Sequence, residues 1–246
     1  MQRPDVIALR QFYSASLGRK VKQRLRHMLL EAWPEHEGET ILGLGYATPL
    51  LRTLERSSSG KRATLIAGMP AVQGAIYWPV HTDNRSFLMD EKSLPLRDNS
   101  VNRIIMLHVF EHCAEPEKLL AECYRMLVPG GRIIIIVPNR RGVWQSVGET
   151  PYKQGKPYRS SQLKQLLNAE AFTLRDVRTA LFTLPFAHPI LLRIWDIWER
   201  LFGLVFWGMG GVIIIEAEKQ IYAAIPEPVF KTKRQTRWLG AAAPAG

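Results

Sequence analysis

The feature that most constrains the fold of this chain is a regular alternation of short apolar runs with longer stretches of helical periodicity. The strand-like runs lie at residues 40–44, 63–67, 85–89, 102–107 and 132–137. Apolar residues recur at helical spacing over residues 49–56, 115–127 and 160–170. Because parallel strands need helical crossovers, this alternation predicts a mostly parallel sheet with helices packed on both faces.

The run RIIIIV at residues 132–137 is the strongest strand signal in the chain. Its consecutive apolar residues predict a strand that is covered on both sides. Two later apolar runs, 172–179 and 212–225, extend the same sheet. We therefore predict an α/β, doubly wound, Rossmann-like domain in which ligands bind at the carboxyl ends of the strands.

Further segments flank this domain, since 246 residues are enough for one α/β domain with appendages. We predict a basic, amphipathic N-terminal helical segment over residues 1–36, the α/β domain over 37–225 and a basic, flexible tail over 226–246. The apolar side of the first helix holds Leu17, Val21, Leu25, Met28 and Ala32, and its opposite side holds Arg19, Lys20, Lys22, Arg24 and Arg26. Pro34 ends this helix.

The net charge of +11 is concentrated at the two ends of the chain. Residues 1–30 carry seven basic side chains and one acid, and residues 231–246 carry four basic side chains and no acid, which leaves a net charge of +1 for the 200 residues between them. This distribution favours contact of residues 16–33 and 231–237 with an anionic membrane surface or with nucleic acid. The alternative is a solvated basic helix and a loose tail.

Residues 181–211 form an aromatic-rich insertion. The uncharged stretch that begins inside it, Leu201–Ile215, has 15 residues, which is shorter than the roughly 20 that a membrane-spanning helix needs. We predict a helix around residues 189–202, then a glycine turn and a strand. In this interpretation the aromatic residues pack against the sheet, and a substrate lid or a membrane-facing patch are the alternatives.

The cysteines and the first residues indicate the cellular setting. Cys113 and Cys123 are too few for a disulfide scaffold and match no metal-ligand spacing. The opening MQRPDVIALR lacks the long apolar core of a signal peptide. We therefore predict a cytoplasmic protein with reduced thiols, peripheral to the membrane if its basic ends bind one.

The stretch ILGLGYATPLL at residues 41–51 has the outline of a strand, a glycine turn and a helix. Gly43 and Gly45 permit close approach to the backbone. Thr48 is a good N-cap residue, and Pro49 suits the first helical position. The N-terminus of this helix suits an anionic group such as a carboxylate, and the alternative is a tight turn without a ligand.

The stretch DEKSLPLRDNSVNRIIMLHVFEH at residues 90–112 places two acids after one strand and two histidines after the next. Asp90 is suited to accept hydrogen bonds from an exocyclic amine. His108 and His112 suit proton transfer near neutral pH. A metal would need a third ligand, which the pattern does not supply, so we predict no metal. The alternative role for Glu111 and His112 is to cap the next helix.

Four stretches in order, ILGLG, DEKSLPL, NRIIMLHVFEH and LLAECYRMLVPGGRIIIIVPN, resemble the motif series of class I S-adenosylmethionine-dependent methyltransferases of the ubiquinone/menaquinone-biosynthesis-like group. The resemblance covers about residues 40–180, and the last stretch is its most specific part. It implies a seven-stranded sheet with an antiparallel last strand, S-adenosylmethionine as cofactor, and methyl transfer by in-line displacement.

The resemblance also implies site residues, with departures. Gly43 stands where the family has an acid, Ala47 and Pro49 stand where it has loop glycines, and Ala67 stands where an acid grips the ribose. The candidates to replace those lost contacts are Tyr13, Tyr46 and Met69. The expected cofactor-binding residues are Gly43, Leu44, Gly45, Tyr46, Ala67, Met69, Asp90, Glu91 and His108, and the candidate catalytic residues are His108, His112 and Tyr158.

The expected function is S-adenosylmethionine-dependent methyl transfer to a small, amphiphilic or acidic acceptor. Asn139, Arg140 and Arg141, which follow the strand of residues 132–137, either hold an acidic substrate or cap the sheet edge. The missing acids suit a catalytically inactive methyltransferase-fold protein with a binding or regulatory role. The basic ends suit a nucleic-acid methyltransferase.

Overall fold

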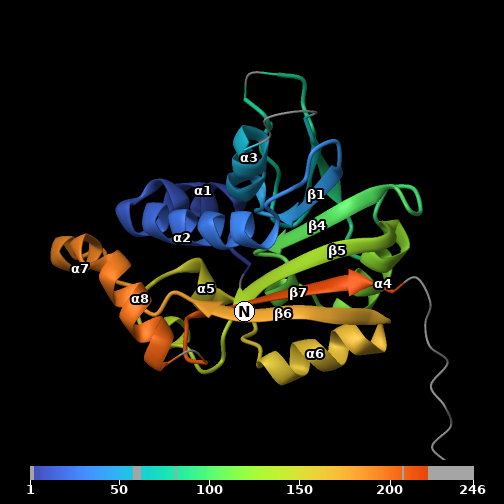
Figure 1. The fold of residues 1–246 in the computed structure, drawn as a ribbon. Helices are drawn as coiled ribbons and strands as arrows, with labels where there is room; N and C mark the ends of the chain where they lie inside the picture. Colours follow the sequence, from blue (N-terminus) through green and yellow to red (C-terminus); the bar gives the residue numbers. More distant parts are fainter. Residues whose placement is uncertain (1–2, 58–61, 81, 207, 221–246) are drawn as a thin grey trace, which may run out of the picture.

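The computed structural model describes residues 3–57, 62–80, 82–206 and 208–220. Its centre is a seven-stranded sheet in the order β3-β2-β1-β4-β5-β7-β6 (Figure 1). The strands are β1 Thr40–Gly45, β2 Thr64–Pro70, β3 Ser86–Met89, β4 Val101–Leu107, β5 Leu127–Pro138, β6 Phe172–Ala180 and β7 Val212–Lys219. β7 runs antiparallel to β5 and β6, and the other neighbouring pairs are parallel. The predicted doubly wound sheet and its antiparallel last strand are confirmed.

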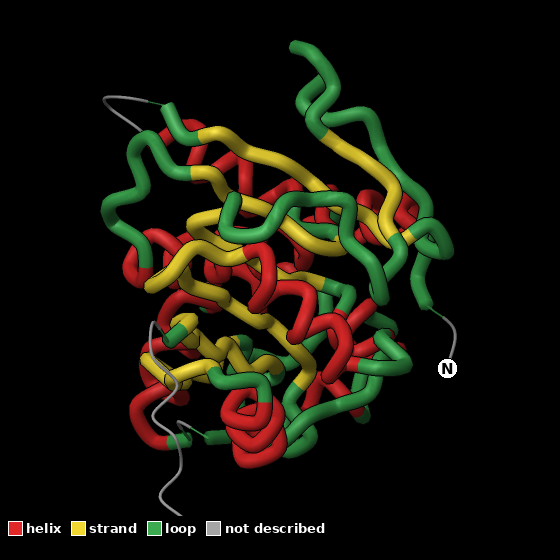
Figure 2. Tube along the Cα trace, turned by 90° about the vertical axis from the view of Figure 1, so that its right-hand side faces the viewer, coloured by secondary structure: helices red, strands yellow, loops and turns green. Residues whose placement is uncertain are grey.

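The helices of the described residues lie around this sheet, and Figure 2 shows the strands one above another with a progressive twist. The α-helices are α1 Val6–Ser14, α2 Ser16–Ala32, α3 Thr48–Ser57, α4 Pro116–Met126, α5 Pro151–Gln154, α6 Ser160–Ala169, α7 Pro189–Arg193 and α8 Trp195–Val205. Two short 3-10 helices are η1 Phe110–His112 and η2 Val143–Gln145.

The central strands separate two hydrophobic cores, because successive residues of a strand point to opposite faces. Ile105 and Leu107 of β4 pack in the core that α1, α2 and α3 cover. Ile104 and Met106 pack in the core that α4 and α6 cover. The apolar run of β5 divides in the same way, which explains why residues 132–137 carry no polar face.

The N-terminal segment contains two helices where the sequence predicted one. Asp5 caps α1 by accepting a hydrogen bond from the Ala8 N–H at 2.7 Å. The chain then turns sharply at Ala15, and a Cβ at Gly18 would lie 1.9 Å from the Phe12 carbonyl oxygen. Only glycine therefore allows α1 and α2 to pack this closely. α2 ends at Ala32, before Pro34, as predicted.

The aromatic insertion contains α7 and α8 rather than one helix over 189–202. Trp195 is buried, as the packing interpretation expects, but Ile190, Ile197 and Leu201 are 64, 60 and 58% exposed. Much of this insertion therefore presents apolar side chains to solvent. In the described part of the chain, no helix is both long enough and apolar enough to cross a membrane. The predicted tail over 226–246 lies outside the described residues.

Candidate functional site

The glycine loop after β1 is shaped by packing of the chain against itself. A Cβ at Gly43 would lie 2.8 Å from the Ala47 Cβ and from the Leu51 Cδ1. Gly45 has a φ of +76°, and a Cβ there would lie 2.3 Å from the Leu107 carbonyl oxygen. Both glycines therefore allow β1 to contact α3 and β4 closely, and their presence needs no ligand.

The start of α3 differs from the prediction by one residue. The Ala47 carbonyl accepts hydrogen bonds from the N–H groups of Leu50 and Leu51 at 2.9 and 3.0 Å, so the helix begins at Thr48. The expectation that Thr48 is the N-cap is therefore wrong. Pro49 takes the second helical position, where its missing N–H still removes no intrahelical hydrogen bond.

The residue that follows β4 is His108, which is fully buried and has a φ of +55°. Few residues other than glycine adopt this backbone conformation, and it recurs at functional sites. The His108 Nδ1 lies 3.1 Å from the Glu111 Oε1, and its Nε2 lies 2.9 Å from the Tyr13 hydroxyl. The Gln73 side chain also donates to the His108 carbonyl at 3.3 Å. Side-chain and backbone contacts thus fix this imidazole on all sides.

Three tyrosines surround His108. The Tyr13 and Tyr152 hydroxyls lie 2.7 Å apart, and the Tyr152 ring centroid lies 4.7 Å from that of His108. Tyr13 stacks on Tyr46 with ring centroids 5.6 Å apart. None of these four side chains is more than 4% exposed. We call Tyr13, Tyr46, His108 and Tyr152 the aromatic cluster, and it fills the space beside the carboxyl ends of β1 and β4.

Burial is the largest influence on the phenols of this cluster. It raises the pKa of Tyr46 to about 12 and raises the pKa values of Tyr13 and Tyr152 further. Because all three stay protonated at neutral pH, they are suited to donate hydrogen bonds and not to act as phenolate bases.

A cavity of about 530 Å³ lies at the carboxyl ends of β2 and β3. Three loops line it, at residues 70–72, 88–92 and 113–115. Asp90 is exposed there, and its Oδ1 accepts a hydrogen bond from the Lys92 N–H at 3.0 Å. Glu91 forms an ion pair with Arg3 at the same cavity. The two predicted acids therefore both line an open cavity, together with Glu115.

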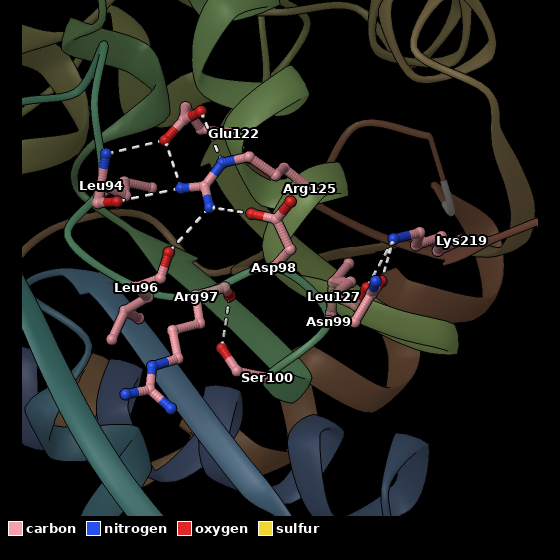
Figure 3. Close-up of polar contacts among 10 residues, drawn as sticks. All are labelled: Leu94, Leu96, Arg97, Asp98, Asn99, Ser100, Glu122, Arg125, Leu127 and Lys219. Atoms are coloured by element: carbon pink, nitrogen blue, oxygen red, sulfur yellow. Dashed lines mark hydrogen bonds and ion pairs between the residues drawn. The ribbon is translucent and has the colours of Figure 1, made fainter.

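The loop that follows Asp90 is held in place by Arg125 of α4 (Figure 3). The Arg125 guanidinium donates to the carbonyls of Leu94 and Leu96 at 3.0 and 2.8 Å. It also pairs with the carboxylates of Asp98 and Glu122 at 2.6 and 2.8 Å. Glu122 in turn accepts from the Leu94 N–H at 2.8 Å. The acidic turn and the helix before the Pro-Gly-Gly turn, predicted as separate motifs, are thus one hydrogen-bonded unit.

Three other predicted cofactor-binding residues lie in the hydrophobic cores. Leu44, Ala67 and Met69 are at most 1% exposed. β2 is longer than predicted and ends at Pro70, so Ala67 lies inside the strand, opposite Gly43 of β1. The residue at the carboxyl end of β2 is Pro70, which also lacks a carboxylate.

The remaining catalytic candidates lie apart from His108. His112 is half-buried, its Nε2 has no partner among the described residues, and burial lowers its pKa to about 4. Tyr158 packs in the other core, with its ring 5.3 Å from that of Phe110. The structure therefore joins Tyr152, and not Tyr158, to the His108 imidazole. Over the described ranges, no three His, Cys, Asp or Glu side chains gather as a metal site.

Comparison with known proteins identifies the kind of domain. Residues 69–135 match a family described as a methyltransferase domain. A Mycolicibacterium smegmatis protein described as a probable S-adenosylmethionine-dependent methyltransferase is 33% identical over 86 residues, which are 34% of this chain and 33% of that protein. A ubiquinone/menaquinone biosynthesis C-methyltransferase of Acidiphilium cryptum is 38% identical over 51 residues, 21% of this chain and 20% of that enzyme. The chain thus spans a third or less of the length of these relatives.

The fold is similar to that of a solved structure over most of the chain. A chain from the Haloferax volcanii complex between the Trm112 methyltransferase activator and a methyltransferase is similar with a TM-score of 0.57 and 19% identity, over 87% of this chain and 99% of that chain. Residues 69–135 thus resemble a methyltransferase domain, and the surrounding fold is similar to that of proteins described as S-adenosylmethionine-dependent methyltransferases.

The residues present fit one end of this cofactor and not the other. The cavity beside Asp90 combines apolar walls with a carboxylate that can accept a hydrogen bond from an exocyclic amine. At the carboxyl ends of β1 and β4, by contrast, the aromatic cluster occupies the space, and neither Gly43 nor Pro70 supplies a carboxylate. The cofactor therefore fits as far as its adenine end in this conformation of the chain.

Proposed function

We propose that this methyltransferase domain transfers a methyl group from S-adenosylmethionine to a small, amphiphilic or acidic acceptor, in the manner of the ubiquinone/menaquinone-biosynthesis-like group. The single observation that carries the proposal is the cavity beside Asp90, at the carboxyl edge of a sheet whose residues 69–135 match a methyltransferase domain. This is the edge at which open α/β sheets bind their ligands.

The bound cofactor would supply an activated methyl group on its sulfonium. In this chain Asp90 would accept a hydrogen bond from the cofactor, and the walls formed by Pro70 and Met89 would exclude water from its aromatic ring. Arg125 keeps the loop that carries Asp90 in position. His108 is the group suited to orient or deprotonate an acceptor, once a ligand takes the place of the Tyr13 hydroxyl at its Nε2.

A second candidate is a methyltransferase-fold protein that binds a partner or ligand without catalysis. The specific observation in its favour is the buried contact of the Tyr13 and Tyr152 hydroxyls with each other and of Tyr13 with His108. These contacts occupy the His108 imidazole and the two phenols with each other and not with a cofactor. This candidate predicts that the purified chain binds neither S-adenosylmethionine nor its demethylated product.

Calorimetric titration of the whole chain with S-adenosylmethionine and with S-adenosylhomocysteine separates the two candidates. Binding of either compound at micromolar to low millimolar concentration supports the methyltransferase. If neither compound gave a binding heat at millimolar concentration, the methyltransferase proposal would be rejected in favour of the non-catalytic candidate. Adenosine, titrated in parallel, reports whether the open cavity alone accepts the adenine end.

Attachment of the basic ends to a membrane or to nucleic acid is a separate proposal. Two ion pairs reduce the free charge of the predicted basic helix, because Lys20 pairs with Asp196 at 3.0 Å and Arg24 lies 3.7 Å from Glu199. The exposed apolar side chains of α7 and α8 lie near this helix and suit a membrane surface better than nucleic acid. Co-sedimentation with anionic vesicles and gel shift with RNA at increasing salt distinguish the two partners.

A further inference from the structure

A second cavity, of about 490 Å³, is lined by residues of α1, α2 and α3. These three helices lie on one face of the sheet (Figure 1). Four positive side chains converge on this cavity, Arg10 from α1, Lys22 and Arg26 from α2, and Arg52 from α3. No aspartate or glutamate lines it, and none of the four cations has an ion-pair partner among the described residues. This differs from Lys20 and Arg24 of the same helix α2, which do have acidic partners.

Burial and the excess of positive charge both lower the pKa of Lys22. Burial has the larger effect, and the neighbouring Arg26, Arg52 and Arg19 add to it. Like charges held this close destabilise the folded chain unless an anion lies between them. A cavity of this kind is therefore expected to bind a group with more than one negative charge.

Hydroxyl groups add the hydrogen bonds that an oxyanion needs. Tyr46 and Thr48 line the cavity and are only 4 and 5% exposed, yet neither hydroxyl bonds to another described residue. Thr48 also begins α3, whose positive dipole end faces the same space. Neither hydroxyl oxygen is fully buried, so both are accessible from the cavity and can bond to a ligand.

Part of the lining is mostly apolar. It comes from the loop between β2 and β3, which contributes Ile76, Tyr77, Trp78 and Val80. Tyr77 and Val80 are 58 and 60% exposed, so this part of the lining offers unburied apolar surface to a ligand. An anion with a flat or apolar body fits such a site better than a bare ion.

We propose that this cavity binds a phosphate monoester with an aromatic or apolar body, with the phosphate held by Arg10, Lys22, Arg26 and Arg52. A phosphate is favoured over a carboxylate because it carries close to two negative charges at neutral pH and offers three acceptor oxygens. The bounded volume favours a small molecule or a single lipid headgroup over a nucleic-acid strand. The cavity shares no lining residue with the one beside Asp90, and it borders the aromatic cluster through Tyr13 and Tyr46.

The test uses the whole chain and three soluble probes: phenyl phosphate, inorganic phosphate and benzoate. Isothermal titration should give the tightest binding for phenyl phosphate. Arg26→Ala/Arg52→Ala should weaken it by about tenfold or more, since charged hydrogen bonds contribute about 1.5–3 kcal/mol each. The matched control is Arg62→Ala/Arg97→Ala, which removes the same charge from exposed positions outside the cavity and should change the dissociation constant less than about threefold.

A second arm identifies the source of the phosphate. Vesicles of phosphatidic acid, whose headgroup is a phosphate monoester, and phosphatidylcholine in equal parts are compared with pure phosphatidylcholine vesicles. Binding only to the anionic vesicles, lost in the cavity variant and kept in the control variant, assigns the phosphate to a lipid headgroup. If phenyl phosphate and the vesicles both fail to bind, or if both variants weaken binding equally, the proposal is overturned.

Stability gives a readout that does not depend on a chosen probe. Without ligand, Arg26→Ala/Arg52→Ala should have a higher Tm than Arg62→Ala/Arg97→Ala, because it relieves the repulsion around Lys22. Phenyl phosphate should raise the Tm of the natural chain and of the control variant only. A cavity variant that melts below the control without ligand would contradict the unbalanced charge on which the proposal rests.

Discussion

The two halves of the carboxyl edge of this sheet differ in what fills them. The half at β2 and β3 is an open cavity lined by loops, with exposed Asp90. The half at β1 and β4 is closed by the aromatic cluster, no member of which is more than 4% exposed. Because both halves belong to the same parallel strands, the difference does not come from the sheet.

The difference comes from α1, which precedes the sheet in the chain. Tyr13 of α1 supplies the ring and hydroxyl at the centre of the closed half. α1 is also tied to the open half, because the Val6 N–H donates to the Gln73 carbonyl at 2.9 Å and Arg3 pairs with Glu91. The short N-terminal helix thus decides how much of the cofactor edge is accessible, and each half makes a different prediction.

The largest effect is expected from opening the closed half. Tyr13→Ala removes a buried ring and leaves the His108 Nε2 and the Tyr152 hydroxyl without their partner. We expect a loss of about 3–5 kcal/mol in the free energy of unfolding, measured with urea. Tyr13→Phe keeps the ring and should lose only about 1–3 kcal/mol.

The same pair of variants tests whether Tyr13 competes with the cofactor. If the cluster occupies the cofactor's place, Tyr13→Ala should bind S-adenosylhomocysteine more tightly than the natural chain does, despite its lower stability. Tighter binding to Tyr13→Ala than to Tyr13→Phe would locate the competition in the ring. Weaker binding to both variants would mean that Tyr13 contacts the cofactor directly.

The next effect concerns the open half. Asp90→Asn keeps the oxygen that accepts from the Lys92 N–H but removes the negative charge that the cavity presents. We expect the dissociation constant of S-adenosylhomocysteine to rise about tenfold, as for a lost charged hydrogen bond. Asp83→Asn, at an exposed position away from the cavity, is the control. An unchanged constant in Asp90→Asn would remove Asp90 from the site.

A smaller effect is expected from His112, on the pH dependence of the free energy of unfolding. Burial lowers the pKa of His112 in the folded chain to about 4, whereas an unfolded histidine titrates near 6.5. Between these values the unfolded chain binds the extra proton, so the free energy of unfolding falls as the pH falls from about 6.5 to about 4. Partial exposure of the ring reduces the expected contribution to about 1 kcal/mol.

His112→Gln removes this titration. The free energy of unfolding of the variant, relative to the natural chain, should therefore rise by about 1 kcal/mol between pH 7 and pH 4. His188→Gln, at the exposed histidine immediately before α7, is the matched control. If the free energy of unfolding fell equally between pH 7 and pH 4 in the natural chain and in His112→Gln, His112 would not be protected from protonation in the folded state.

The fold could be predicted because its signals are local. Alternating runs and the residues of each strand specify the sheet, and all five predicted parallel strands are present within a few residues of their predicted bounds. The position of Asp90 and Glu91 after a strand could also be predicted, and their role toward a cofactor stays a prediction. Both predictions rest on residues that are neighbours in the sequence.

The closed half could not be predicted in the same way. Tyr152 lies 139 residues from the Tyr13 hydroxyl that it contacts, and no local pattern distinguishes it from Tyr158, six positions later, which was the expected candidate. α1 has nine residues, and an isolated helix of that length is unstable in water. Tertiary contacts of Leu9 and Tyr13 stabilise it, so its periodicity alone is a weak signal.

The smallest effect should come from the ion pair that joins α1 to the open half. Arg3→Gln leaves the Glu91 carboxylate unpaired at the cavity, where it attracts positive charge. S-adenosylmethionine carries one more positive charge than S-adenosylhomocysteine, so the ratio of their affinities should shift two- to threefold toward the cation, within the usual range for a partly exposed pair. The ratio cancels changes in folding that affect both ligands equally. Arg97→Gln leaves Glu91 paired and should not change this ratio. If Arg3→Gln changed the affinity for both ligands equally, Glu91 would not lie near the charged end of the cofactor.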